Sequence, residues 1–374
     1  MAPPAFPAPS PPRRSLLARR LGLFSLAHAL SLGVFCAGFL LTRVELPDAS
    51  SCDSPPPTLR DAAAWREAHG CWGVPRAFDR VAVLVVDALR WDMAYGGAVE
   101  APREHDLRMT SLERLAGEDP RRCVLRKFTA DPPTTTQQRL KGLVTGGLPT
   151  FVDIGKSFGT TALTEDNVVR QLRAVGRRVA LLGDDTWMQL FGPEDFSFSA
   201  PYPSLNVNDL HTVDDGVESH LGPLLAAPGT WDLLIGHFLG VDHAGHIFGV
   251  RSEQMASKLA QMDGVVERVV EQLRADPAHN GTLLLVVSDH GQTLTGDHGG
   301  GTPAEADAVL FAAAFGEPGG GPGDVLAAAE AAAPREDVPQ IDFAPTLAAL
   351  LGAPVPFGSL GRVSAELWAR SEAA

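Results

Sequence analysis

The sequence predicts an α/β domain with a doubly wound, mostly parallel sheet flanked by helices, preceded by one N-terminal transmembrane helix. Two observations predict the domain. Residues 81–86 form an unbroken apolar run of the kind found in strands buried inside parallel sheets. Strand-like and helical segments then alternate along the chain, which indicates βαβ units. A third observation, the uncharged apolar run 21–42, predicts the membrane helix.

The alternation can be followed segment by segment after the first strand. Further strand candidates are 178–183, 231–237, 282–288 and 306–314. Helical candidates are 134–145, 165–175, 253–275 and 342–351. Ligands of such sheets bind beyond the carboxyl ends of the strands, so functional residues are expected directly after strands.

The N-terminal apolar run carries one ionisable residue, His28, and no formal charge. Arg13, Arg14, Arg19 and Arg20 precede it, so the positive-inside rule keeps the N-terminus cytoplasmic and places the rest of the chain in a lumen. The segment is too long for the apolar region of a cleaved signal peptide. We therefore expect a cytoplasmic tail (1–20), a signal anchor (21–42), a lumenal linker (43–78) and the α/β domain (79–374).

Bulk composition excludes some partners. A formal net charge of -14 over 374 residues, without clustered Lys and Arg, argues against a nucleic-acid partner. Four cysteines are too few for a disulfide scaffold, but Cys52 and Cys71 flank a Pro-rich stretch and are the candidates for one disulfide in an oxidising lumen. Asn280 begins an N-G-T glycosylation sequon between a predicted helix and a predicted strand.

Six polar side chains stand where the predicted strands end. Carboxylates and imidazoles together suit zinc better than magnesium, with manganese as the alternative. Six ligands can hold two divalent ions three apiece, which leaves open positions for phosphoryl transfer. A lone Asp after a strand is ordinarily a loop or cap residue, but all six follow strands in chain order. They are Asp87, Asp242, His246, Asp289, His290 and His298.

A nucleophile candidate lies in the D-P-P-T-T-T run that starts at Asp131, directly ahead of a helical stretch. Two prolines cannot sit inside that helix, so Thr134 falls near its N-cap. The helix dipole and a metal ion would there lower the pKa of its hydroxyl and make it a nucleophile. A simple capping threonine is the alternative for Thr134, and Thr135 is the alternative nucleophile.

The motifs together resemble the alkaline phosphatase superfamily and, within it, the GPI ethanolamine phosphate transferases, most closely their type-3 group. The resemblance runs from about Cys52 to the C-terminus and rests on VVDALRWD, DPPTTTQQRLKGLVTGGLPTF, GDDTW, HFLGVDHAGH, SDHGQTLTGDHGG and PTLAALLGAPVPFGSLG. It implies one zinc ion held by Asp242, His246 and His298 and a second held by Asp87, Asp289 and His290, with Thr134 bridging toward the second.

The resemblance also implies an activity and a location. Members of this family transfer phosphoethanolamine from phosphatidylethanolamine to a mannose of the GPI-anchor precursor, the third mannose in the type-3 group, in the endoplasmic reticulum lumen. A phospho-threonine intermediate and a separate stabilising membrane subunit are implied. Asp184 and Asp185, in GDDTW after another predicted strand, are candidates to contact the ethanolamine ammonium group.

One departure and two alternatives accompany this interpretation. Family members continue into a multi-spanning membrane region, whereas this sequence ends at Ala374, so we expect impaired acceptance of a large GPI precursor. The alternatives are a lumenal metal-dependent phosphodiesterase or phosphatase of the same superfamily, in which water replaces the acceptor, and a non-catalytic membrane-bound subunit. A sulfatase would need a C/S-x-P-x-R nucleophile segment, which the PPTTTQQR segment does not supply.

Overall fold

A single mixed sheet organises the folded part of the chain. The computed structural model describes residues 13–39, 46–54, 71–73, 76–96, 109–148, 162–316 and 337–370, and within these ranges eight strands form one sheet in the order β4-β3-β5-β1-β6-β7-β2-β8. Their bounds are β1 Arg80–Val86, β2 Cys123–Thr129, β3 Val179–Asp184, β4 Phe198–Tyr202, β5 Leu233–Phe238, β6 Thr282–Val287, β7 Asp307–Phe315 and β8 Asp337–Pro339.

Strand direction confirms the predicted fold class. Every paired strand runs parallel to its neighbour except β7, which is antiparallel to both β6 and β2. The prediction located the segments that became β1, β3, β5, β6 and β7. It missed β2, β4 and β8.

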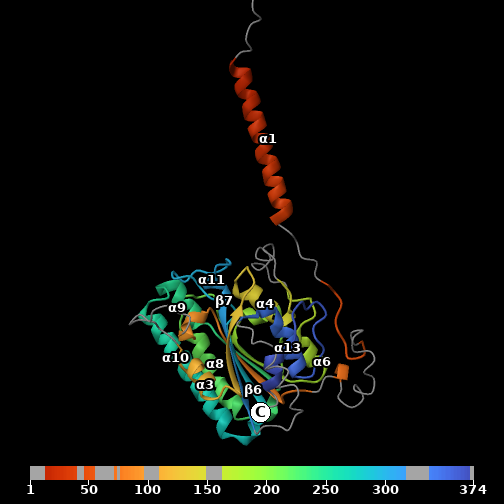
Figure 1. The fold of residues 1–374 in the computed structure, drawn as a ribbon, viewed down its shortest axis with the longest axis vertical. Helices are drawn as coiled ribbons and strands as arrows, with labels where there is room; N and C mark the ends of the chain where they lie inside the picture. Colours follow the sequence, from red (N-terminus) through yellow and green to blue (C-terminus); the bar gives the residue numbers. More distant parts are fainter. Residues whose placement is uncertain are drawn as a thin grey trace, which may run out of the picture.

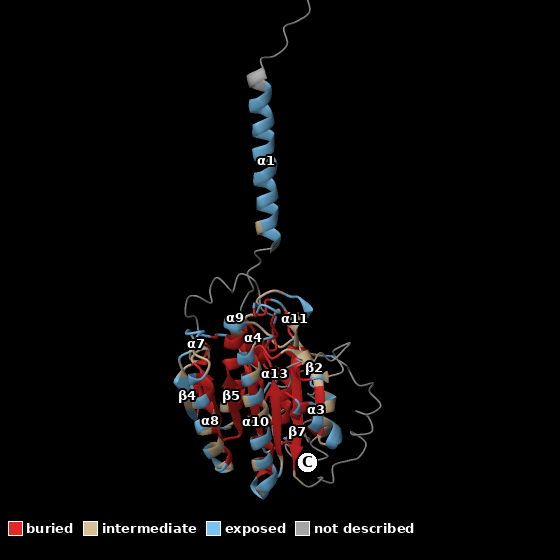
Figure 2. Ribbon diagram, turned by 90° about the vertical axis from the view of Figure 1, so that its left-hand side faces the viewer, coloured by how far each residue is buried: buried red, intermediate tan, exposed pale blue. Residues whose placement is uncertain are grey.

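Helices cover both faces of the sheet, which explains the unbroken apolar runs. In β1, Val81, Val83 and Val85 point into one core cluster, while Ala82, Leu84 and Val86 point into the other. A strand buried on both faces has no polar alternation. Figure 2 shows these strands as a buried layer between outer helices with exposed surfaces.

The helices divide between the two faces according to the core cluster they join. On one face lie α3 (Ser111–Glu118), α8 (Thr212–Leu225) and α10 (Glu253–Ala275). On the other lie α4 (Thr136–Thr145), α6 (Val168–Ala174), α7 (Thr186–Leu190), α13 (Phe343–Leu350) and α14 (Ala365–Ala369). Two short helices, α9 (Gly240–Phe248) and α11 (Pro303–Ala306), lie at the end of the sheet where the parallel strands finish (Figure 1).

The N-terminal helix α1 (Arg13–Phe39) stands clear of the sheet domain (Figure 1). Its segment Leu16–Gly38 is long and apolar enough to cross a membrane, judged by length and composition. Of the predicted boundaries, residues 1–12 and 40–45 lie outside the described residues. The stretch that follows is fastened to the domain, because Ser50 N donates to Asp166 Oδ2 (2.8 Å) and Gln171 Nε2 donates to Ser50 O (2.7 Å).

A disulfide joins the two cysteines of this N-terminal stretch. Cys52 and Cys71 are bonded with their Cα atoms 4.8 Å apart, inside the usual range for such bonds. The indole of Trp72 donates to Ser51 O (2.8 Å), which ties the two ends of the closed loop together a second time.

Candidate two-metal site

The six predicted ligands come together at the carboxyl ends of the central strands. Strand β1 pairs with β5 on one side and β6 on the other, with the strand ends nearly level, so residues that follow these three strands must lie close together. They are Asp87 after β1, Asp242 and His246 on α9 after β5, and Asp289, His290 and His298 after β6.

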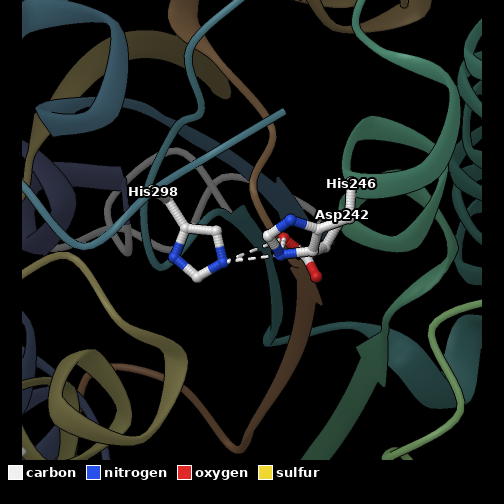
Figure 3. Close-up of side chains that lie close together, drawn as sticks. All are labelled: Asp242, His246 and His298. Carbon is white, nitrogen blue, oxygen red and sulfur yellow. Dashed lines mark hydrogen bonds and ion pairs between the residues drawn. The ribbon is translucent and has the colours of Figure 1, made fainter. Parts of the chain in front are cut away.

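Three of them form what we call the open group: Asp242, His246 and His298. Asp242 and His246 are one helical turn apart on α9, and the loop after β6 brings His298 to them (Figure 3). Asp242 Oδ1 lies 3.4 Å from His246 Nε2 and 3.3 Å from His298 Nε2, and the two Nε2 atoms are 3.0 Å apart. The His246 side chain is 30% exposed, so this group opens to solvent.

The other three form the buried group: Asp87, Asp289 and His290. His290 Nε2 lies 3.5 Å from Asp87 Oδ1 and 3.3 Å from Asp289 Oδ2, and all three side chains are inaccessible. The imidazoles of His290 and His298 stack with ring centroids 4.1 Å apart. The two groups are therefore adjacent, as a two-ion site for one phosphoryl group requires.

The chemistry of these atoms fits two divalent cations. Among the described residues, the oxygens Asp87 Oδ1, Asp242 Oδ1 and Asp289 Oδ2 are buried without a hydrogen-bond donor. A buried, unpaired carboxylate oxygen is costly, and cations are what such oxygens ordinarily coordinate. Each of the three points into one of the groups, where imidazole Nε2 atoms converge on the same position.

Burial, together with neighbouring charges of both signs, shifts the pKa values of these groups in the absence of metal. Burial, followed by the charges of Asp289 and Asp242, raises the pKa of Asp87 to about 6. Burial, followed by the charge of His298, lowers the pKa of His290 to about 4. Burial also acts to lower the pKa of His298, but its close contact with the Asp242 carboxylate (3.3 Å) outweighs burial and raises the pKa to about 9.

Backbone carbonyls set the orientation of two of the imidazoles. His290 Nδ1 donates to Gly291 O (2.9 Å) and His298 Nδ1 donates to Thr134 O (2.8 Å). A proton fixed on Nδ1 leaves the Nε2 lone pair free for a ligand. Both rings thus present Nε2 to the groups.

Thr134 holds the loop that carries His298, which differs from its predicted role. Helix α4 begins at Thr136 with Thr135 at the N-cap position, so Thr134 lies outside the helix and is not its cap. Its buried hydroxyl donates to Gly300 O (2.9 Å) and accepts from Gly299 N (3.0 Å). These bonds and the carbonyl bond to His298 show that Thr134 supports the loop, and its assignment as nucleophile stays a prediction.

Thr136 is the threonine that faces the buried group. Its Oγ1 lies 3.3 Å from Asp87 Oδ2 and 3.4 Å from His290 Nε2. As the first residue of α4, it stands at the positive end of the helix dipole. Choosing among three consecutive threonines requires the helix start to within one residue, and the sequence does not provide that accuracy.

Glycines let the His298 loop approach α9. Gly296 has φ +84, and a Cβ there would overlap Gly245 O and crowd His246 N. A Cβ on Gly245 would in turn overlap the side-chain amide of Gln292. The glycines of the HAGH and TGDHGG motifs therefore allow the backbone contact that brings His246 and His298 together.

Comparison with known proteins identifies the family. The family model described as type I phosphodiesterase / nucleotide pyrophosphatase matches residues 168–303. The human GPI ethanolamine phosphate transferase 3, catalytic subunit, is 44% identical over 348 residues, which cover 91% of this chain and 30% of the human protein. The GPI ethanolamine phosphate transferase 3 of Saccharomyces cerevisiae is 36% identical over 354 residues, 91% of this chain and 32% of the yeast protein. This chain belongs to the GPI ethanolamine phosphate transferase family. It spans about a third of the length of these relatives.

Solved structures agree on the fold of this GPI ethanolamine phosphate transferase family member. The lipooligosaccharide phosphoethanolamine transferase A of Neisseria meningitidis aligns with a TM-score of 0.52 at 16% identity, over 78% of this chain and 58% of that chain. Murine ectonucleotide pyrophosphatase/phosphodiesterase 5 aligns with a TM-score of 0.53 at 12% identity, over 74% of this chain and 96% of that one.

The two aspartates of the GDDTW motif have different surroundings. Asp184 is 1% exposed, and its Oδ1 lies 3.0 Å from His237 Nδ1, so it faces the interior beside that ring. Its predicted contact with the ethanolamine group stays a prediction. Asp185 is half-buried and accepts from Ser204 Oγ (2.6 Å). A contact of Asp185 with the ethanolamine group stays a prediction.

Several residues that support the site could not be recognised from the sequence, because most of them lie far along the chain from the residues that they contact. Glu305 accepts from Gly300 N, Thr302 N and Thr302 Oγ1 and so shapes the loop after His298. Gln340 donates to Ser288 O and Asp289 O from a segment 51 residues further along the chain. Asp214 contacts the start of α9 from α8. Only His237, inside the GHF segment that ends β5, stood in a quoted motif.

Proposed function

We propose that this chain is the catalytic domain of an enzyme that transfers phosphoethanolamine from phosphatidylethanolamine to a mannose of the GPI-anchor precursor, the third mannose by its similarity to the type-3 relatives. The observation that carries this proposal is the position of Thr136, whose hydroxyl lies within 3.4 Å of two members of the buried group. The open group adjoins that group through the stacked rings of His290 and His298. A nucleophile next to two three-ligand groups suits phosphoryl transfer in two steps.

In the first step Thr136 takes the phosphoethanolamine group from the donor lipid. Thr136 Oγ1 attacks the phosphorus, a P–O bond to threonine forms, and the bond from phosphorus to the glycerol oxygen breaks. The proton lost by Thr136 ends on the hydroxyl of the released diacylglycerol. The free N–H groups in the first turn of α4 favour negative charge on this oxygen during the attack.

In the second step the group passes to the acceptor. A mannose hydroxyl attacks the phosphorus, the bond to Thr136 breaks, and the proton of the mannose hydroxyl returns to Thr136. The exposed edge of the open group, at His246, is where the acceptor enters. Two divalent ions held by the two groups would lower the pKa of the threonine hydroxyl and offset the charge that develops on the phosphoryl oxygens. The mixture of carboxylates and imidazoles favours Zn²⁺, with Mn²⁺ as the alternative.

The proposal includes a location and partners. Helix α1 anchors the chain in the endoplasmic reticulum membrane with its N-terminus cytoplasmic and the sheet domain lumenal, where donor lipid and GPI mannolipid meet. The human relative is named a catalytic subunit, which supports an assembly with at least one further subunit.

Mass spectrometry of the full chain in detergent tests the nucleophile and the donor together. After incubation with Zn²⁺ and phosphatidylethanolamine, we expect a phosphoethanolamine adduct on Thr136, and none after chelation of the metal. Thr136→Ala abolishes the adduct and lowers kcat/KM by roughly 10³-fold or more. Thr134→Ser, which keeps its hydroxyl, retains the adduct on Thr136.

The alternatives give different outcomes. An adduct on Thr134 would confirm the assignment made from the sequence. An adduct on Thr136 that is discharged by water and is insensitive to a mannose-containing glycolipid would identify a phosphodiesterase. A chain that binds no metal and forms no adduct would be a non-catalytic subunit.

A further inference from the structure

A line of buried polar side chains runs across three neighbouring strands to Asp87. Asp184 ends β3, His237 lies near the end of β5, and Asp87 follows β1. The His237 side chain is fully buried, with Nδ1 3.0 Å from Asp184 Oδ1 and Nε2 3.3 Å from Asp87 Oδ2. Trp187 Nε1 donates to His237 Nδ1 at 2.9 Å.

Nδ1 of His237 can pair with only one of Trp187 and Asp184 at a time, and the proton on Nε2 points at Asp87 in two of the three protonation states of the ring. In one of these states the neutral ring accepts the Trp187 N–H at Nδ1 and carries its proton on Nε2. In the other the imidazolium donates from Nδ1 to Asp184 and from Nε2 to Asp87. The third state, with a proton on Nδ1 alone, would set the Nε2 lone pair against the Asp87 carboxylate.

This contact decides which oxygen of Asp87 is left for a metal ion. Oδ2 accepts a hydrogen bond from Thr136 Oγ1 (3.3 Å) and has His237 Nε2 as an ion-pair neighbour at the same distance. Oδ1 faces His290 in the buried group and, among the described residues, has no donor of its own. With Oδ2 occupied, the carboxylate turns Oδ1 toward the position where the other two ligands converge.

We propose that His237 is a positioning residue for the metal ion of the buried group, with Asp184 and Trp187 holding its ring. The inference rests on the proposed two-metal function and adds residues that act through Asp87. Ligating carboxylates and histidines depend on such outer partners for orientation and affinity. It also explains two motifs whose roles were open, GDDTW and GHF. Gly183 of the first motif has no Cβ because one would lie 2.7 Å from His237 Cβ.

Two substitutions at His237 separate the donor from the side chain's bulk. His237→Asn keeps a polar group near the Nδ1 position, facing Trp187 and Asp184, but is too short to reach Asp87. His237→Gln extends an amide toward the Nε2 position. We expect His237→Asn to weaken zinc binding at the buried group about 10- to 100-fold, with the open group unchanged, and His237→Gln to weaken it less.

Equilibrium dialysis of the full chain in detergent, with zinc counted by mass spectrometry, measures this effect independently of activity. Reference variants assign the sites: Asp289→Asn disables the buried group and Asp242→Asn the open group. His237→Asn combined with Asp242→Asn should then bind no zinc at concentrations where its combination with Asp289→Asn still binds one ion. His279→Asn is the matched control, because His279 is equally buried, bonds to Leu225 O (2.8 Å) and lies at the other end of β6.

The outcomes separate the inference from the function on which it rests. If the wild type binds two zinc ions and His237→Asn binds both with unchanged affinity, the positioning role is overturned and the proposed function stands. If His237→Asn loses zinc affinity equally at both groups, and His279→Asn shows the same loss, the positioning role is overturned and general destabilisation of the fold explains the result. Wild type that binds no zinc overturns the proposed function first. If His237→Asn does not fold, Trp187→Phe decides: a several-fold loss confined to the buried group supports the role, and no loss overturns it.

Discussion

His298 carries a proton at neutral pH when no metal is bound, because Asp242 raises its pKa to about 9 against the opposing effect of burial. A histidine must be neutral to coordinate a metal ion. Zinc binding to the open group should therefore expel about one proton at about pH 7.5, and the apparent affinity should rise roughly tenfold per pH unit until about pH 9. Calorimetric titration in buffers of different ionisation enthalpy counts this proton.

The buried group provides an internal contrast for the proton count. Its histidine, His290, has a pKa lowered to about 4 and is already neutral at that pH. The Asp289→Asn chain, which retains the open group, should release about one proton per ion, and the Asp242→Asn chain far fewer. A count near zero in the Asp289→Asn chain would contradict the protonation assigned to His298.

At the level of single residues, candidate site residues that follow a strand could be recognised from the sequence, whereas the residue at a helix start that faces the site could not. The clustering of the six candidate ligands could be predicted because a polar residue after a buried strand has its position fixed by the sheet. Thr134 and Thr136 could not be distinguished, since one residue at a helix start decides which hydroxyl faces the site. The contact of Asp184 with His237 could not be predicted either, because the fully buried His237 belongs to a strand 53 residues further on.

At the level of elements, α9 is capped from another helix. Its N-cap residue, Leu239, has no capping side chain. Asp214 of α8 supplies the acceptor, with Oδ1 accepting from Leu239 N (2.8 Å) and Gly240 N (3.1 Å). Its other oxygen accepts from the fully buried Lys258 of α10 (3.0 Å). This junction of three helices fixes the helix that carries Asp242 and His246.

Removing Asp214 alone should lower the free energy of unfolding more than replacing both Asp214 and Lys258. Asp214→Ala leaves the Lys258 ammonium group buried and two backbone N–H groups unpaired, so we expect the free energy of unfolding to fall by about 3–5 kcal/mol. The double variant Asp214→Asn, Lys258→Met removes both charges. Its loss in free energy of unfolding should be smaller than the sum of the losses in the two single variants. Urea unfolding measures both, and strictly additive losses would contradict the coupling. Arg114→Ala is the control, because Arg114 forms exposed ion pairs with Glu118 and Glu267, whose removal should lower the free energy of unfolding by only about 1 kcal/mol.

The strands that could be predicted from the sequence are those buried on both faces of the sheet. Strands β1 and β6 are buried on both faces, so their apolar runs stand out in the sequence. Strand β2 carries Arg126 and Lys127, which pair with Glu366 and Asp307, so its sequence has no apolar run. Strand β4 is half exposed and β8 has three residues, too few to show a pattern. The two edge strands β4 and β8, and β2 beside one of them, could therefore be found only in the structure.

At the scale of the whole molecule, the linker keeps the sheet domain close to the proposed membrane. Ser50 is bonded to Asp166, just ahead of α6, and α1 ends at Phe39. The chain between these two points can span at most about 40 Å. The attachment point of the domain at Asp166 is therefore held within about this distance of the end of α1.

The side of the membrane on which the domain lies can be determined from glycosylation. Asn280 is exposed in the turn before β6, but the Thr282 of its sequon is fully buried as the first residue of that strand. Modification must therefore precede the folding of β6. With a lumenal domain, we expect a glycosidase-sensitive mass on the full chain in cells, and its loss in Asn280→Gln.

A second glycosylation site, with an exposed sequon, distinguishes a domain on the cytoplasmic side from a lumenal domain whose Asn280 sequon is buried before it can be modified. Asn206 and Asn208 lie exposed in the segment after β4, and Asn208→Ser creates a sequon at Asn206 whose third residue is also exposed. Glycan on Asn206 but not on Asn280 would keep the lumenal orientation and show that β6 folds before the transferase reaches its sequon. Glycan on neither site would place the domain in the cytoplasm, because an exposed sequon there meets no glycosylation machinery. The positive-inside assignment of Arg13, Arg14, Arg19 and Arg20 would then be wrong.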